Sequence, residues 1–446
     1  MSVDLAKPID RKSKASRPVL ECMQGNILKA HHRRHTALLL ISLDSKPGTR
    51  AAFREFAGKT VTSAWEQRQQ SLRRHENGGT ELFGNLFLSV WGYLKLGYSW
   101  EVLRTAFFDR EADDQFLNWF LQGMEHTGWA LADPPRAEWE PQYQQRTDSM
   151  LLLACSDPKK LEAAVDAAKS QISGFGSVLG EERGRSYYRD GHAVEPFGFA
   201  DGISQPRFFA DDPEPVSPLT VLLPDPLAGR PDAYGSFLVY RKLEQNVKAF
   251  HEAEKAIADT LGLQGADRER AGAMMMGRFR DGTPLIRSCT PLGPSQANNR
   301  FDFRRDPDGA RCPFHAHIRK VNPRPSQRKP MARRGVPYGS YDPADAQATP
   351  PERDCGLLFM SFQRDIHVQF GALQMHWINS ADFPRPRTGQ DPVAGQGNVA
   401  TIPKWPLKWG DASAGTMECA VSRMVRLKGG EYFFAPSLPF FQTLGV

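Results

Sequence analysis

Short apolar runs bounded by polar turn residues recur along this chain. The clearest is TALLLISLDS at residues 36–45, too short for a core helix and flanked by charged or polar positions. A run of this kind predicts a buried strand. By the same criterion we expect strands at residues 36–45, 149–155, 235–243 and 356–363, at the start of 82–97 and near Tyr432.

Between these runs, apolar positions follow the period of a helix. Residues 159–171 place Leu161, Ala164, Ala167 and Ala168 on one face, which predicts an amphipathic helix. Further helices are expected at residues 46–74, 100–123 and 247–261, and near 365–379. Because none of the strands leads into a Gly-rich phosphate turn, this alternation favours an α+β fold over a nucleotide-binding one.

The two halves of the chain repeat a similar order of strands and helices. Residues 222–235 (LLPDPLAGRPDAYG) form a Pro/Gly/Asp-rich linker between them. We therefore predict a duplicated fold with a boundary near residue 225, giving domains at 19–225 and 226–446. The polar first 18 residues are expected to be a disordered leader.

The composition, with 40% hydrophobic and 24% charged residues, is that of a folded globular protein. The length of 446 residues exceeds that of a typical single core and predicts about two domains. The six cysteines are dispersed without a CxxC pair, which indicates free thiols in a reducing compartment. No secretion signal and no apolar run of membrane-spanning length is visible. We therefore expect a cytoplasmic protein that does not associate with a membrane.

The net charge of +6 is concentrated in one segment, residues 311–339 (RCPFHAHIRKVNPRPSQRKPMARRGVPYG). It holds eight Lys or Arg, two histidines and five prolines, and no carboxylate. Three interpretations are open: a site with a histidine for a metal and cations for an anionic ligand, a nucleic-acid patch, or a solvated loop.

Two histidines in this segment, His315 and His317, are the possible metal ligands. On an extended backbone they would share a face and could chelate one ion, whereas on a helix they would diverge. A lone histidine is more often a packed core or surface residue. The Arg319 and Lys320 that follow His317 favour a ligand role, because they would bring cations to the carboxylates of a large anionic cofactor.

A second motif, GFADGISQP at residues 198–206, surrounds Asp201 with two glycines and several apolar residues. Glycines at this spacing allow a tight backbone path that presents the carboxylate to a cleft. An Asp-Gly pair is often only a turn cap. Phe197, Phe199 and Ile203 nevertheless favour partial burial, which would make Asp201 a candidate proton carrier.

Together these motifs resemble the dye-decolorizing peroxidases. The resemblance is carried by GFADGISQP, GSFLVYRKLEQNV, RCPFHAHIRKVNPR, RRGVPYG and GLLFMSFQRDI, with MQGNIL near the N-terminus similar to the opening of longer members. It implies a duplicated ferredoxin-like α+β fold, with antiparallel sheets flanked by helices, and one haem b per chain. It also implies that His317 is the proximal iron ligand, Asp201 the distal acid-base residue and Arg333 the distal arginine.

The resemblance implies further roles around the cofactor. Asp365 is a candidate for the carboxylate partner of His317. Arg319 is a candidate propionate contact, with a surface salt bridge as an equal alternative. Leu358 with Met360, or else Leu357 with Phe359, is the candidate strand pair lining the distal pocket, with ordinary strand core as the alternative. Four aromatic residues are possible electron relays: Tyr338, Trp377, Trp405 and Trp409.

The chain departs from the family in two places. His315 stands where a small residue is usual, which suggests a propionate bond, and Gly371 follows Phe370 where a Glu is common.

The implied activity is oxidation of dyes, phenols and other aromatic donors by hydrogen peroxide, in one-electron steps through a ferryl intermediate. The first alternative is a haem-binding protein of the same fold that handles haem or its iron without peroxide turnover. Asp201 and Arg333 count against it, because a carrier needs neither a proton shuttle nor an anion-stabilising cation. Nucleic-acid binding ranks last, because no aromatic residues for base stacking are interleaved with the basic residues.

Overall fold

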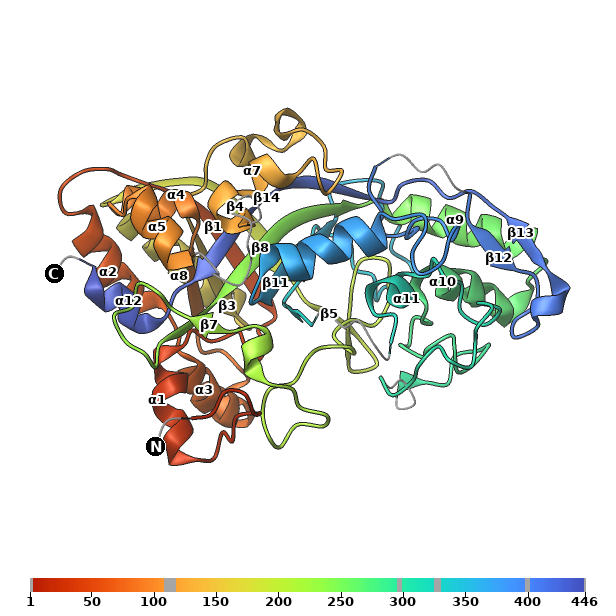
Figure 1. The fold of residues 1–446 in the computed structure, drawn as a ribbon, viewed down its shortest axis with the longest axis horizontal. Helices are drawn as coiled ribbons and strands as arrows, with labels where there is room; N and C mark the ends of the chain where they lie inside the picture. Colours follow the sequence, from red (N-terminus) through yellow and green to blue (C-terminus); the bar gives the residue numbers. More distant parts are fainter. Residues whose placement is uncertain (1–2, 108–117, 295–298, 325–329, 398–401, 445–446) are drawn as a thin grey trace.

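The computed structural model describes residues 3–107, 118–294, 299–324, 330–397 and 402–444. Over these residues the chain forms a large antiparallel sheet with helices packed around it (Figure 1). This arrangement confirms the predicted α+β class. None of the helices in the described ranges is both long and apolar enough to cross a membrane.

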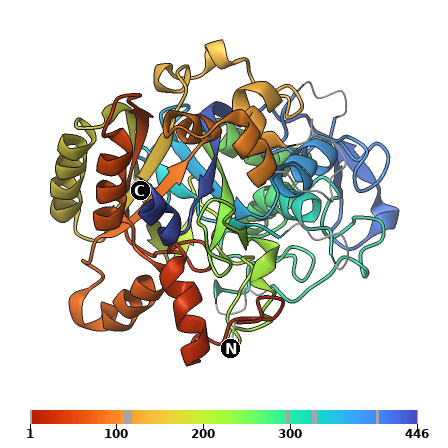
Figure 2. The ribbon, with the colours of Figure 1, turned by 60° about the vertical axis from the view of Figure 1, so that its left-hand side comes forward.

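Four strands of the first half lie side by side in the order β2-β3-β1-β4. They are β1 (His35–Leu43), β2 (Phe83–Leu88), β3 (Ser149–Cys155) and β4 (Gly176–Arg185). Apolar residues face each other along their length, as where Leu38 pairs with Leu152. Two helices, α2 (Thr49–Thr60) and α8 (Pro158–Ile172), cover one face of these strands (Figure 2). In β1, β2 and β3 nearly every residue is buried, which explains why these three strands are apolar runs rather than alternating ones.

The second half repeats this order as β10-β11-β8-β14. The strands are β8 (Tyr234–Gln245), β10 (Val336–Tyr338), β11 (Gly356–Gln363) and β14 (Val425–Ala435). In both halves the strands therefore run second, third, first and fourth across the sheet, which confirms the predicted duplication. We propose the boundary near residue 225, beside β7 (Leu223–Pro224), as the division between the halves.

The two groups of strands join into one sheet that closes on itself. Phe434 of β14 pairs with Leu88 of β2, and Tyr338 of β10 pairs with Gly184 of β4. Strand β8 meanwhile pairs with both β11 and β14. The main hydrophobic core includes residues from the strands of both halves.

Two helices of the second half, α9 (Val247–Thr260) and α10 (Glu269–Met276), lie side by side (Figure 1) and contribute to a second core around Phe197, Phe250 and Trp405. The other helices of this half are α11 (His317–Val321), η8 (Ile366–Gly371) and η9 (Gln374–Ile378), and η8 packs on β8 and β11. The helix expected near residues 365–379 is thus present, but η8 and η9 have π-helical geometry. Such wide turns are frequent at functional sites.

Two of the helices expected in the first half are interrupted. Residues 46–74 form α2 and α3 (Ala64–Asn77), separated at Val61. Residues 100–123 contain α5 (Trp100–Phe107) and α6 (Trp119–Gln122), and the intervening part lies outside the described residues. The smaller elements are η1 (Lys14–Ser16), α1 (Arg17–Cys22), α4 (Val90–Lys95), α7 (Met124–Thr127), η3 (Arg136–Glu138), η4 (Pro141–Tyr143), β5 (Tyr187–Arg189), β6 (His192–Val194), η5 (Pro218–Thr220), η6 (Gly265–Arg268), β9 (Ala332–Arg333), β12 (Lys404–Pro406), η10 (Ala412–Ala414), β13 (Thr416–Glu418) and α12 (Leu438–Thr443).

The prediction of a disordered leader at residues 1–18 is wrong for residues 3–18. Leu5 and Ile9 are buried, and the Ile9 amide donates to the Phe208 carbonyl at 2.8 Å. Arg11 forms an ion pair with Asp211. Residues near the N-terminus thus bond partners about 200 positions away in the chain. The polar composition of the segment alone does not predict these contacts.

Candidate active site

His317 is the first residue of α11, and its ring bonds a buried carboxylate. The His317 Nδ1 lies 2.7 Å from Oδ2 of Asp391, whose side chain is fully buried. The other oxygen of Asp391 accepts the backbone N–H groups of Val393 and Ala394, at 2.8 and 3.0 Å. With Nδ1–H donated to Asp391, the lone pair of Nε2 is the one available to a metal.

Electrostatics couple His317 and Asp391. Burial by itself lowers the pKa of His317, but the Asp391 carboxylate outweighs it and the net pKa is raised. Burial raises the pKa of Asp391, and the His317 ring with the two backbone amides lowers it further than burial raises it. The His317 side chain keeps 28% of its surface exposed. The ring is therefore oriented by the carboxylate while part of it stays accessible.

Arg333, on the short strand β9, meets the segment that carries Asp201. Its guanidinium donates to the Ser204 carbonyl at 3.1 Å, and its backbone N–H donates to the Gln205 side chain at 3.0 Å. The positive charge of Arg333 also acts to lower the pKa of His317, so these two groups are within electrostatic reach. The 198–206 motif and the basic segment therefore meet at Arg333.

The turn before Asp201 is built around a residue that the sequence did not single out, Glu195. Its carboxylate accepts the N–H groups of Phe197 and Phe199, both at 3.0 Å, and the side-chain amide of Gln245 at 2.9 Å. Burial, with a smaller effect from the Asp201 charge, raises the pKa of Glu195. Gly198 has a positive φ of 89°, so the glycine is required here by the backbone.

Asp201 itself is half-buried, with one side-chain oxygen accepting the Gly202 N–H at 2.6 Å. Its backbone N–H donates to the Ala193 carbonyl at 2.8 Å. These contacts hold Asp201 through its backbone N–H and through one oxygen of its carboxylate. They leave the second carboxylate oxygen for other partners.

The choice of Leu358 and Met360 as lining residues is wrong. Both are buried in the main core, so their side chains are already covered by protein. The alternating residues Leu357 and Phe359 are half-buried. Arg333 pairs with Ser361 on the same strand, and side chains two residues apart share a face. Leu357 and Phe359 therefore lie on the Arg333 face.

Arg319 does not have the exposure that a propionate contact requires. Its guanidinium is buried, donates to the Asp306 carboxylate at 2.6 Å and also bonds the Cys312 carbonyl. It lies over the rings of Phe303 and Phe314. The predicted cofactor role is wrong, because these contacts occupy the side chain in holding the 303–314 loop.

His315 is likewise buried, with its ring edge-on to Trp405 at 4.5 Å between centroids. Burial, with the charge of Lys320, lowers its pKa to about 3. The residue therefore packs as a neutral core histidine, and the expected propionate bond is wrong. Within the described residues there is no group of three or more His, Cys, Asp or Glu arranged for a metal ion. That His317 is the metal ligand stays a prediction.

Asp365 is not the carboxylate partner of His317. Its side chain caps η8 by accepting the Val368 N–H at 2.6 Å. The partner, Asp391, lies in a Pro/Gly-rich loop with no periodicity. One signal was present: Asp391 is the single charged residue between positions 389 and 400.

Gly371, the departure from the family pattern, makes room for an aromatic ring. A Cβ at this position would lie 2.7 Å from Cη2 of Trp119. Trp119 comes from α6 in the first half of the chain and also packs near His367 and Tyr432. A larger residue such as Glu would displace this indole, so the position of Trp119 requires the glycine.

The aromatic residues considered as relays are mostly packed inside the protein. Trp377 stacks on Phe383 with ring centroids 5.0 Å apart, and Trp405 and Tyr338 are buried. The indole N–H of Trp409 donates to the Leu285 carbonyl at 3.0 Å. A relay role for any of them stays a prediction.

The residues present fit a haem. A carboxylate-bound imidazole with an accessible edge is a suitable axial donor for iron. Arg333 and the Asp201 turn supply a cation and a carboxylate, and Leu357 and Phe359 supply half-exposed apolar surface on the Arg333 face. These are the groups that a flat, apolar macrocycle with a reactive metal would need around it.

Comparison with known proteins gives consistent matches. Residues 195–384 match the family model for the C-terminal part of Dyp-type peroxidases. The whole chain is 38% identical to the multifunctional dye peroxidase DyP2 of Amycolatopsis sp., with 100% of both sequences covered. The DyP2 structure has a TM-score of 0.88 over 99% of this chain and 100% of that one, at 35% identity. A DyP-type peroxidase from Anabaena sp. has a TM-score of 0.87, with 33% identity and 98% and 97% coverage.

Proposed function

The chain belongs to the Dyp-type peroxidase family, and we propose that it binds one haem b and uses hydrogen peroxide to oxidise dyes, phenols and other aromatic donors in one-electron steps. The observation that carries the proposal is the buried Asp391 carboxylate bonded to His317, with Arg333 in electrostatic reach. A haem would supply the iron and the delocalised electrons for peroxide reduction.

On the proximal side, His317 would hold the iron through Nε2. Asp391 accepts the Nδ1 proton at 2.7 Å and so fixes both the ring orientation and the tautomer. A carboxylate in this position increases the electron donation of the imidazole, which favours cleavage of an O–O bond.

On the peroxide side, Asp201 would take the proton of hydrogen peroxide and return it to the departing oxygen. One of its oxygens is occupied by the Gly202 N–H, which leaves the other for this transfer. Arg333 would stabilise the negative charge that develops along the O–O bond. Its side-chain bond to Ser204 leaves further guanidinium N–H groups to do so.

Visible spectroscopy of the purified protein, with rapid addition of hydrogen peroxide, tests the proposal. We expect a Soret band that changes within milliseconds and peroxide-dependent bleaching of an anthraquinone dye. Arg333→Leu should slow the spectral change by a factor of about 100 or more, as expected for loss of a charge-stabilising donor. A wild-type protein that binds haem but neither responds to peroxide nor oxidises dye would refute the peroxidase and favour the haem-handling alternative.

We also propose a cytoplasmic location. All six cysteines are free in the structure, and four of them are buried: Cys22, Cys155, Cys312 and Cys355. Free thiols in this number are typical of a reducing compartment.

A further inference from the structure

The loop that carries Asp391 is held against helix η9 by side-chain amides. The Asp391 N–H donates to the Ile378 carbonyl at 3.0 Å, and Gln390 Nε2 donates to the Asn379 carbonyl at 2.8 Å. The same nitrogen of Gln390 also bonds the Gln396 carbonyl at 3.0 Å. Both ends of the 390–396 loop are thus tied to the end of η9.

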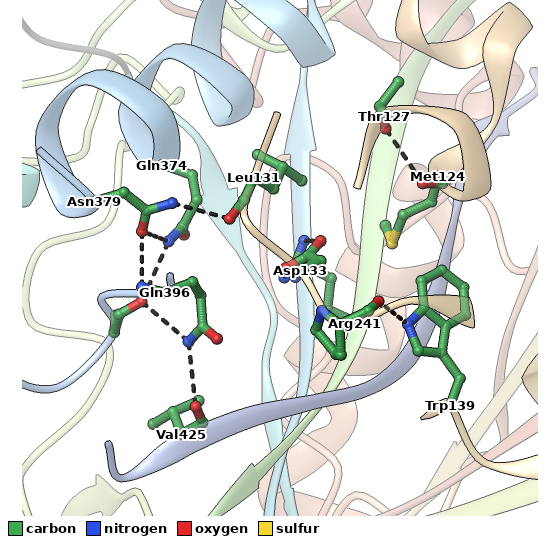
Figure 3. A network of polar contacts seen from close by, with 12 residues as sticks. Met124, Thr127, Leu131, Asp133, Trp139, Arg241, Gln374, Asn379, Gln396 and Val425 are labelled. Atoms are coloured by element: carbon green, nitrogen blue, oxygen red, sulfur yellow. Dashed lines mark hydrogen bonds and ion pairs between the residues drawn. The ribbon is translucent and has the colours of Figure 1, made fainter. Parts of the chain in front are cut away.

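Asn379 is at the centre of this arrangement (Figure 3). Its Oδ1 accepts from Gln374 Nε2 at 2.8 Å and from the Gln396 N–H at 2.9 Å. Gln374 Nε2 also donates to the Ala394 carbonyl at 3.2 Å. Since the Ala394 N–H in turn bonds Asp391, the amide of Gln374 is one residue away from the carboxylate that orients His317.

The other end of Asn379 reaches the first half of the chain. Its Nδ2 donates to the Leu131 carbonyl at 2.9 Å (Figure 3). Two residues further on, Asp133 forms a buried ion pair with Arg241 of β8. Gln396 Nε2 similarly bonds the Val425 carbonyl at the start of β14, at 3.2 Å. The loop is therefore anchored to the 131–133 segment and to the start of β14, as well as to η9.

The side chains that hold the 390–396 loop are all neutral amides: Gln374, Asn379, Gln390 and Gln396. An amide supplies both donors and acceptors without placing a charge beside the buried carboxylate and imidazole. A charged residue in the same position would compete with His317 for Asp391 or repel one of them. Neutral amides are therefore suited to fixing the position of the Asp391 carboxylate.

We propose that Asn379 and Gln374 are positioning residues that fix the Asp391 carboxylate and, through it, the electron donation of His317 to the iron. The inference rests on the proposed haem ligation by His317. Ligand-orienting partners of this kind typically change metal affinity or activity by 10- to 100-fold when removed.

The test is the Fe(III)/Fe(II) reduction potential of the holoenzyme, together with the rate of haem transfer to excess apomyoglobin. Asn379→Ala and Gln374→Met should both raise the potential, because a displaced carboxylate makes the imidazole a poorer donor. Both should also speed haem loss by about tenfold. The matched control is Asn246→Ala, which removes an amide that caps α9 by accepting the Ala249 N–H at 2.8 Å. It should lower the melting temperature and leave the potential unchanged.

A double-mutant cycle separates positioning from general damage. In an Asp391→Asn background, adding Asn379→Ala should produce no further change in potential, because the route through the carboxylate is already lost. The proposal is overturned if Asn379→Ala and Gln374→Met lower only the melting temperature, as the Asn246 control does. It is equally overturned if Asn379→Ala shifts the potential as much in the Asp391→Asn background. Failure of the haem proposal would look different: His317→Ala would then keep the wild-type Soret band.

Discussion

Asp391→Asn isolates the bond between the carboxylate and His317. An asparagine keeps one oxygen for the N–H groups of Val393 and Ala394, so the loop should retain its path. The other side-chain atom becomes an amide nitrogen, which cannot accept the Nδ1 proton across the present 2.7 Å. The substitution therefore removes a charge-assisted hydrogen bond and little else.

The expected size of the effect follows from the burial of this bond. Hydrogen bonds to charged groups contribute about 1.5–3 kcal/mol. At about 1.4 kcal/mol for each factor of ten, that corresponds to roughly 10- to 100-fold. We expect Asp391→Asn to slow the first spectral change with hydrogen peroxide, and to speed haem loss, within this range. Stopped-flow absorbance and haem transfer to apomyoglobin measure the two rates.

Asp365→Asn is the matched control. The side chain of Asp365 caps η8 through the Val368 N–H, and Asn is as good a cap as Asp. This variant should behave as wild type in both assays. Wild-type rates in Asp391→Asn, or equal losses in the two variants, would refute the assignment of Asp391 as the partner of His317.

Four further outcomes are expected. His317→Ala should lose the Soret band of bound haem, as measured on protein reconstituted with one equivalent. Leu358→Ala should lower the free energy of unfolding by about 2–5 kcal/mol in urea melts, whereas Phe359→Ala should alter the haem spectrum with a smaller loss of stability. Arg319→Ala should cost about 3–5 kcal/mol of apoprotein stability, since it leaves a buried Asp306 charge unpaired. Burial raises the pKa of Glu431 from 4.5 to about 7. The stability that the protonated side chain gives to the folded protein is therefore complete below pH 4.5 and is lost as the pH rises through 7. The melting temperature of Glu431→Gln should therefore rise relative to wild type between pH 5 and pH 8.

Much of the fold was predictable because burial leaves a local pattern. Residues 149–155 are apolar at nearly every position, and β3 occupies that range with both faces covered. The amphipathic pattern at 159–171 likewise corresponds to α8. The expected 46–74 helix is interrupted at residues 61–63, where Thr62 forms backbone bonds with Gly25 and Gly84. Ser63 then begins α3 by accepting the Glu66 N–H at 3.0 Å. This Ser-x-x-Glu pattern is a local signal of a helix start, which apolar periodicity alone does not show.

The sequence by itself picked out the segments that carry the candidate chemistry. The residues around His317 and Asp201 made them candidates for a ligand and a proton carrier, and the resemblance to the dye-decolorizing peroxidases implied these roles and that of Arg333. These properties belong to the side chains and their immediate neighbours, so they survive without knowledge of the fold.

Only the tertiary structure decided which side chains face the site and which support it. The alternation of β11 allowed two lining pairs, and its pairing with β9 selects Leu357 and Phe359 by placing them on the Arg333 face. The partner of His317 was likewise undetermined, because Asp391 is 74 residues away in the chain and becomes a buried acceptor only when its loop is tied to η9. Burial and pairing of this kind arise from contacts between distant segments, which no local pattern encodes.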